Sequence, residues 1–189
     1  MYSIWARLTY PFASAGRNLS IHYTCRLKRS VADRIALGNY VIIGKDTWLN
    51  VSGPRPPGGE PAIVVEDGGR VGGWCQITAR NCIHIERNVI VSPSVVIADH
   101  GHAYEDVTRP ISEQGITEGG RIRIGRGSWI GNGAAIVCSR GELVLGQNCV
   151  VAANAVVTRS FPPFSVVVGN PARAVRQFDQ DKKAWVKLA

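Results

Sequence analysis

The chain has 189 residues, 45% of them hydrophobic, with a mean hydropathy near zero, which suits one soluble domain with appended termini. No apolar run approaches a membrane span and residues 1–16 lack the apolar core of a secretory signal, so we expect a cytoplasmic protein. The net charge of +8 comes mostly from scattered Lys and Arg without a nucleic-acid-binding motif, which argues against a nucleic-acid-binding protein.

Residues 1–36 are interpreted as an N-terminal cap segment. Three basic residues follow an aromatic stretch in it: Arg26, Lys28 and Arg29 after Trp5, Tyr10 and Phe12. Such a segment could touch an anionic membrane surface, but a solvated cap is favoured.

Residues 37–160 carry aliphatic side chains at intervals of six, in five sets of three. The sets are Leu37, Ile43, Leu49; Val65, Val71, Ile77; Ile85, Val91, Ile97; Ile124, Ile130, Ile136; and Leu145, Val151, Val157. A period of six fits a short strand plus a turn, and three such units make one triangular coil. The fold predicted is therefore an all-β parallel β-helix of about five coils. Four residues after most of these aliphatics stands a small or β-branched residue, which suits a tight corner.

Interruptions of the six-residue interval locate the loops. A ten-residue insertion around Ser52–Gly59 follows Leu49, and a step of eight separates Ile77 from Ile85. The largest loop insertion is predicted at 98–123, and a slip of three residues falls at Ser139–Gly141. Long excursions from a rigid scaffold often carry function.

The large insertion contains two of the four histidines, in the run Asp99-His100-Gly101-His102-Ala103-Tyr104-Glu105-Asp106. The imidazole pKa lies near working pH, which suits a general base. Asp99 could orient such an imidazole or bind hydroxyl groups of a substrate. The five cysteines lack metal-ligand spacing, so Cys75 and Cys149 are predicted to be buried free thiols.

Residues 161–189 form a C-terminal tail. It contains the turn Gly169-Asn170-Pro171, and two arginines, Arg173 and Arg176, follow without an evident core role. Residues 179–189 are predicted to form a short helix, with Trp185 and Val186 covering the last coil.

The six-residue repeat, the Asp-His-x-His loop and the closing Gly-Asn-Pro-Ala-Arg motif together resemble the hexapeptide-repeat acyltransferases. The resemblance covers roughly residues 20–178, and the loop is most similar to the sugar O-acetyltransferases of polysaccharide and lipopolysaccharide biosynthesis. It implies a left-handed helix, a homotrimer with active sites between subunits, and transfer of an acetyl group from acetyl-CoA to a sugar hydroxyl. No metal is expected.

Matching the family's motifs by position implies roles for individual residues. His100 is the expected general base and His102 its competitor, with Asp99 and Tyr104 near the acceptor. The coenzyme A contacts implied are Trp129, Asn132, Ala153, Thr158, Arg159, Arg173 and Arg176.

Three alternatives remain open at this point. One is an N-acyltransferase of an amino sugar or xenobiotic on the same scaffold. Another is a carbonic anhydrase-like β-helix, which needs three metal-binding histidines, for which only His84, His100 and His102 could serve. The last is a non-catalytic binding module.

Overall fold

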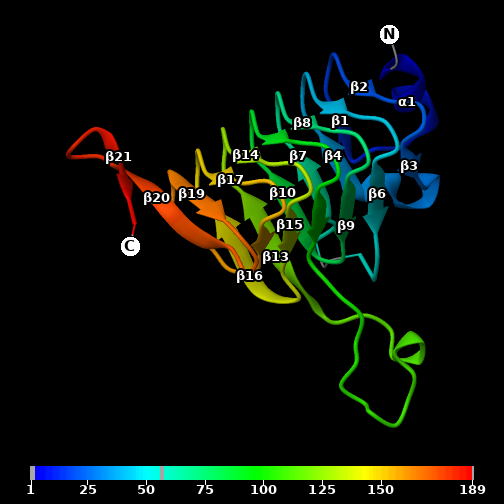
Figure 1. Ribbon diagram of the computed structural model, residues 1–189. Coiled ribbons are helices and arrows are strands. Elements are labelled where there is room, and N and C mark those ends of the chain that lie inside the picture. The colour runs from blue at the N-terminus through cyan, green and yellow to red at the C-terminus, as the bar shows by residue number, and fades with distance from the viewer. Residues whose placement is uncertain (1–2, 56–57, 189) are drawn as a thin grey trace.

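The computed structural model describes residues 3–55 and 58–188. Met1, Tyr2, Ala189 and two residues of the predicted insertion, Pro56 and Pro57, lie outside the described residues. The chain is a left-handed parallel β-helix with three sheets, A, B and C, as its faces (Figure 1), which confirms the predicted fold class. Within the described residues, no helix is long and apolar enough to cross a membrane.

Each coil contributes one strand to each sheet. Sheet A contains β1 (Ser14–Ala15), β4 (Ile35–Leu37), β7 (Ile63–Val65), β10 (Cys82–Ile85), β13 (Gly119–Ile124) and β16 (Arg140–Leu145). Sheet B contains β2 (Ser20–Ile21), β5 (Ile42–Ile43), β8 (Arg70–Val71), β11 (Ile90–Val91), β14 (Trp129–Ile130), β17 (Val150–Val151), β19 (Ser165–Val168), β20 (Arg173–Asp179) and β21 (Ala184–Lys187). Sheet C contains β3 (Arg26–Leu27), β6 (Trp48–Val51), β9 (Gln76–Ala79), β12 (Val96–Ala98), β15 (Ala135–Val137) and β18 (Val156–Val157).

The predicted aliphatic repeat forms the core. All fifteen of its members are buried, none more than 2% exposed. In sheet B, for example, Ile43 pairs with Val71 and Val71 with Val91, so one side chain stacks on the next along the axis. Each coil therefore covers the apolar side chains of the coil before it.

Small polar side chains at the corners tie neighbouring coils together. Thr47 Oγ1 donates to the carbonyl of Gly72 over 2.8 Å, and the Cys75 thiol donates to the carbonyl of Ser92 over 3.2 Å. Cys75 and Cys149 are buried free thiols, as predicted, and burial raises the pKa of both. Corners with Thr, Ser or Cys therefore add a hydrogen bond between coils, whereas other corners hold the buried Val89, Val95, Ala134 and Ala155.

The β-helix begins one coil earlier than predicted. Ala15, Ile21 and Leu27 pair with the first predicted set in sheets A, B and C, which gives six complete coils. The repeat did not mark this coil because its first member is alanine, not a larger aliphatic. The cap itself is the helix α1 (Ser3–Thr9), and the 3₁₀ helix η1 (Arg29–Arg34) links the first coil to the second.

The predicted C-terminal helix is wrong, because the tail forms strands. β20 pairs antiparallel with β19, and β21 pairs antiparallel with β20. Asp179 forms the turn between β20 and β21 by accepting the N–H groups of Asp181 and Lys182. The edge of sheet B offers the backbone partners at once, whereas an isolated helix of this length is marginal in water.

The last coil is also covered by other residues than predicted. Phe161 forms a bridge to Leu145 of sheet A, and Val167 pairs with Val151 in sheet B. Both are buried, whereas Trp185, predicted to cover this end, is 46% exposed and packs edge-on against Phe178. A partial seventh coil thus closes the end.

The large loop leaves the body between β12 and β13 and spans residues 99–118. It projects away from the helix (Figure 1, green) and contains the short 3₁₀ helix η2 (Ile111–Glu113). Residues 119–123 of the predicted insertion already belong to β13, which pairs with β16 in register.

Candidate active site

Asp99 is the first residue of the large loop, and its carboxylate is buried where the loop leaves the β-helix. Its side chain is fully buried and follows directly on β12. Oδ1 accepts the backbone N–H of Arg80 at 2.6 Å, and Oδ2 accepts those of Asn81 at 2.8 Å and Cys82 at 2.9 Å. These three N–H groups compensate the loss of water around a buried carboxylate.

His100 takes the remaining hydrogen bond of that carboxylate. Its Nδ1 lies 2.9 Å from Asp99 Oδ1, and its side chain is only 11% exposed. A carboxylate can only accept, so Nδ1 carries the hydrogen and a neutral ring keeps its lone pair on Nε2. Nε2 has no hydrogen-bond partner within the described part of the chain. The pair therefore has the geometry of an oriented general base.

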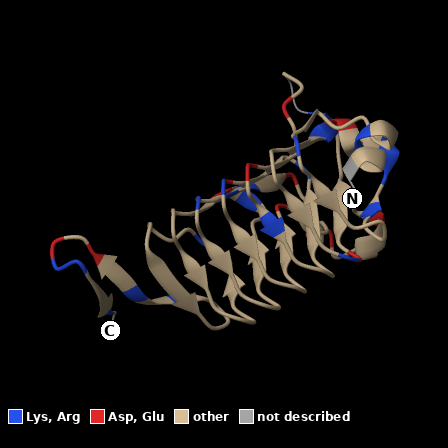
Figure 2. Ribbon diagram, turned by 90° about the horizontal axis from the view of Figure 1, so that it is seen from above, with Lys and Arg blue, Asp and Glu red and all other residues tan. Residues whose placement is uncertain are grey.

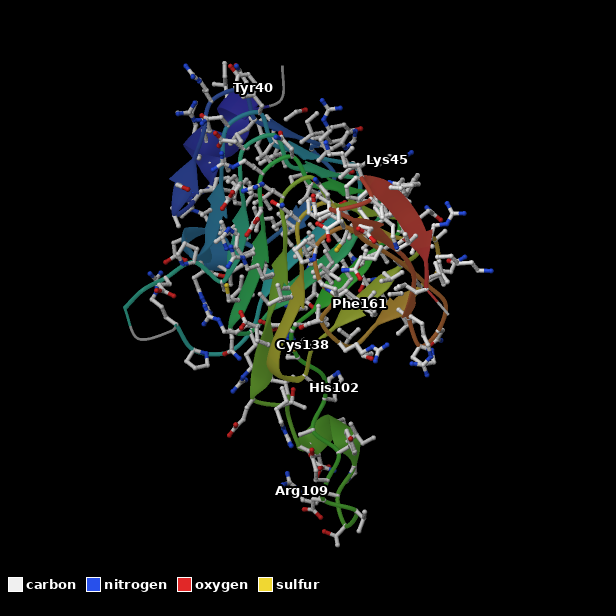
Figure 3. The ribbon with its side chains drawn as sticks, turned by 90° about the vertical axis from the view of Figure 1, so that its left-hand side faces the viewer. Tyr40, Lys45, His102, Arg109, Cys138 and Phe161 are labelled. Carbon is white, nitrogen blue, oxygen red and sulfur yellow. The ribbon has the colours of Figure 1, made fainter. Side chains whose placement is uncertain are left out.

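His102 lies two residues further along the loop and, unlike His100, is neither buried nor oriented by a carboxylate of the described residues. It is exposed, and its backbone forms an isolated bridge to Ile116 across the loop's neck. Figure 3 labels it where the loop leaves the body, with Arg109 near the far end of the loop. Its side chain makes no hydrogen bond to the described residues, so nothing there orients the ring.

Tyr104 lines a hollow of about 550 Å³ between the loop and the start of β16. Glu105, Thr117 and Arg140 line the same hollow, and the tyrosine ring is 66% exposed. Hydrogen bonds from the N–H groups of Tyr104 and Glu105 lower the pKa of the Glu105 carboxyl, and the nearby Arg140 adds to the effect. The hollow thus offers an aromatic ring, a carboxylate and a guanidinium.

Thr158 and Arg159, two further predicted site residues, lie on the same face of the β-helix as the point where the large loop begins. Thr158 follows Val157, which pairs with Ile136, while Ala98 pairs with Val137. Thr158 is therefore two strands from Ala98, roughly 10 Å at the usual strand spacing. Arg159 is exposed, and its guanidinium stacks 5.3 Å from the centre of the Phe161 ring.

A second group lies on sheet B and at its corner with sheet C. Trp129, on the outer face of β14, is half-exposed and donates from Nε1 to Ser92 Oγ over 2.9 Å. Asn132 donates to the carbonyl of Pro93, and its own carbonyl accepts the N–H of Asn154. Ala153 is exposed beside this corner.

The two tail arginines are separated along β20. Arg173 lies opposite Val168, next to the turn at Gly169, whereas Arg176 lies opposite Val166 and also pairs with Lys187. Both side chains are exposed. Only Arg173 is adjacent to the corner that holds Asn132 and Ala153.

No cluster of three or more His, Cys, Asp or Glu side chains that could hold a metal ion occurs in residues 3–55 and 58–188. His84, one of the three histidines of the carbonic anhydrase-like alternative, lies on sheet A, where Nε2 is 2.7 Å from Glu66 Oε1. A single chain therefore offers no ready metal-ligand set for that alternative.

The turn at Arg80 and Asn81 is the part of the site that sequence reasoning missed. Besides holding Asp99, it clamps the returning end of the loop, since Asn81 Nδ2 donates to the carbonyl of Glu118 over 2.9 Å. Its signal was the step of eight residues between Ile77 and Ile85, whose two extra residues form this turn. Arg140 had a similar signal in the slip at Ser139–Gly141.

The curated proteins that this chain resembles in sequence are named as acetyltransferases. No protein-family model matches the chain. It is 29% identical over 161 residues to "Probable acetyltransferase Rv3034c" of Mycobacterium tuberculosis, an alignment that covers 85% of this chain and 48% of that protein. It is 27% identical over 135 residues to "Putative lipopolysaccharide biosynthesis O-acetyl transferase WbbJ" of Escherichia coli, covering 68% and 67%. The chain thus spans about half the length of the first relative.

Solved structures share the fold. An N-acyltransferase from Bacillus cereus, AntD, superposes with a TM-score of 0.74 at 16% identity, over 96% of this chain and 93% of that one. A hexapeptide-repeat-containing acetyltransferase from Vibrio cholerae superposes with a TM-score of 0.62 at 22% identity, over 78% and 72%. By its repeat, its fold and its sequence matches, this chain is a relative of the hexapeptide-repeat, left-handed β-helix acyltransferases.

Proposed function

We propose that the protein is an acetyl-CoA-dependent O-acetyltransferase that acts on a sugar hydroxyl of a surface polysaccharide or of its precursor. The observation that carries the proposal is the Asp99–His100 pair, a buried carboxylate held by three backbone N–H groups and bonded to Nδ1 of a nearly buried imidazole. Acetyl transfer to a hydroxyl requires a base of this kind, because the attacking oxygen must lose its proton.

In the proposed reaction Nε2 of His100 accepts the hydroxyl proton while the oxygen attacks the thioester carbonyl carbon. The carbon–sulfur bond then breaks, and the coenzyme A thiolate takes the proton back from the imidazolium. Asp99 stabilises the transient positive charge on the ring, since its carboxylate contacts Nδ1 at 2.9 Å. This role replaces the predicted contact of Asp99 with the acceptor, because both its oxygens are already used.

The hollow beside Tyr104 is the proposed acceptor site. An exposed aromatic ring offers a platform for the apolar face of a sugar, while Glu105 and Arg140 can bind its hydroxyl or acidic groups. Tyr104 thereby keeps its predicted role, and Arg140 joins it. His102, at the neck of the loop, is proposed to contact substrate without acting as the base.

The proposed coenzyme path follows the corner between sheets B and C. Trp129, Asn132, Ala153 and Thr158 would line the pantetheine arm, and the arginines would meet the phosphates, to which guanidinium groups bind in bidentate fashion. The spacing of two strands between Thr158 and Ala98 supports a thioester lying between the corner and His100. Arg159 and Arg173 are the nearest phosphate candidates, and Arg176 is more remote.

A homotrimer in the cytoplasm is part of the same proposal. The half-exposed rings of Trp74 and Trp129 lie on surfaces that a second subunit could cover. Sedimentation equilibrium of the purified chain would measure the mass of the assembly directly.

The test is a transfer assay with acetyl-CoA and a panel of sugars, amino sugars and nucleotide sugars, in which release of the coenzyme A thiol is followed. We expect acceptor-dependent thiol release and an ester product that hydroxylamine cleaves. An amide product, stable to hydroxylamine, would instead identify the N-acyltransferase alternative. Absence of acetyl-CoA binding by calorimetry would reject the proposal in both forms.

A further inference from the structure

The N-terminal helix α1 has two faces of different character. Ala6 is 1% exposed, and Trp5, Tyr10 and Phe12 pack with it over Ile21 and Leu27 of the first coil. The predicted aromatic residues therefore face inward. On the opposite face Ile4 is 72% and Leu8 81% exposed. These two residues are four positions apart, so they lie side by side on one face of the helix.

The same end of the molecule carries most of the chain's excess charge. Residues 1–32 contain five basic residues and no Asp or Glu, a net of +5 against +8 for the whole chain. The five are Arg7, Arg17, Arg26, Lys28 and Arg29. All five are exposed, and Figure 2 shows blue segments on and beside α1 near the N-terminus.

Neighbouring acidic residues offset this charge only in part. Hydrogen bonds from Asn39 and, to a smaller extent, the charges of Arg87 and Arg17 lower the pKa of the Asp67 carboxyl, so Asp67 partly offsets Arg17. Arg7, Arg26, Lys28 and Arg29 form no ion pair within the described residues. Asp33, the first acidic residue in the sequence, forms an ion pair with Arg55 of the following insertion. Arg26 lies over the ring of Trp48, 5.4 Å from its centre, which holds the guanidinium without neutralising it.

We propose that this end of the β-helix docks on an anionic lipid bilayer, with Ile4 and Leu8 entering the headgroup region and the surrounding Lys and Arg contacting lipid phosphates. An apolar pair at the same end of the molecule as these cations matches a bilayer surface, where hydrophobic insertion and electrostatic attraction act together. Nucleic acid would match the cations but leaves the two aliphatic side chains without a partner. The inference is independent of the proposed acetyl transfer.

The test is cosedimentation of the purified chain with vesicles of phosphatidylcholine alone and of phosphatidylcholine mixed equally with phosphatidylglycerol. We expect binding to the anionic vesicles only, weakening as salt is raised. The Ile4→Ser, Leu8→Ser double variant should bind them roughly tenfold less, and so should the Lys28→Gln, Arg29→Gln double variant.

Two controls match these variants. Val107→Ser removes an aliphatic side chain that is 95% exposed in the large loop, and Lys183→Gln with Lys187→Gln removes two positive charges at the opposite end. Both should bind vesicles as the wild type does. An equal loss in the lysine control would reduce the effect to net charge, and an equal loss in Val107→Ser would reduce it to exposed apolar side chains in general; either result would overturn the inference. Binding to duplex DNA that outcompetes the vesicles, or a changed assembly mass in the Ile4, Leu8 variant, would assign the surface to another partner.

Discussion

The carboxylate of Asp99 joins two successive coils, because the backbone N–H of Arg80 donates to its Oδ1 over 2.6 Å. An amide in its place would offer only one oxygen for four donors. Asp99→Asn should therefore lower kcat by about a hundredfold or more, because His100 loses its orienting acceptor. It should also lower the free energy of unfolding by about 1–3 kcal/mol, since buried N–H groups lose their partner.

Steady-state transfer rates and urea unfolding of the same preparation separate the two effects. Asp106→Asn is the matched control, because that carboxylate is exposed in the loop and, among the described residues, accepts hydrogen bonds only from Thr108. A control that loses as much activity as Asp99→Asn would mean that loop order, not the orientation of His100, limits the rate.

The two loop histidines should respond unequally to substitution. His100→Ala should lower the transfer rate by roughly two to four orders of magnitude, because it removes the base, while coenzyme affinity stays nearly unchanged. His102→Ala should cost far less, since its exposed ring has no orienting partner among the described residues. Rate measurements at saturating acetyl-CoA decide between them, and an equal or larger loss in His102→Ala alone would move the base to that residue.

The sequence predicted the stacked coils, which the six-residue repeat determines, and missed features that depend on individual contacts. An aliphatic residue every six positions suffices to specify stacked coils, so all five sets of core residues were found. The first coil escaped because Ala15 is too small to mark the period, and the tail was misassigned because pairing with the edge of sheet B overrode its helical pattern. The turn at Arg80 could not be tied to Asp99, because 19 residues separate them and only the three-dimensional stacking brings them together.

The tail arginines should affect coenzyme binding and leave the chemical step alone. Arg173→Ala with Arg176→Ala should raise the KM for acetyl-CoA about tenfold or more, with kcat at saturation unchanged, because phosphate contacts are equal in ground and transition states. Of the single variants Arg173→Ala should have the larger effect, since that residue lies next to the turn at Gly169. Arg70→Ala, an exposed arginine of the same sheet in β8, is the control. Unchanged affinity in the double variant would contradict the placement of the phosphates.

The thiol of Cys25 should make the fold sensitive to alkaline pH. Burial, only partly offset by hydrogen bonds from backbone N–H groups, raises the pKa of this thiol from 9.0 to about 11. Between these values the unfolded chain loses the proton while the folded chain keeps it, so stability is fully present below pH 9 and falls as pH rises toward 11. Urea unfolding across that interval should therefore show a steeper decline for the wild type than for Cys25→Ala, since Lys and Tyr titrate alike in both. Parallel curves for the two proteins would mean that the thiol is solvated in the folded state.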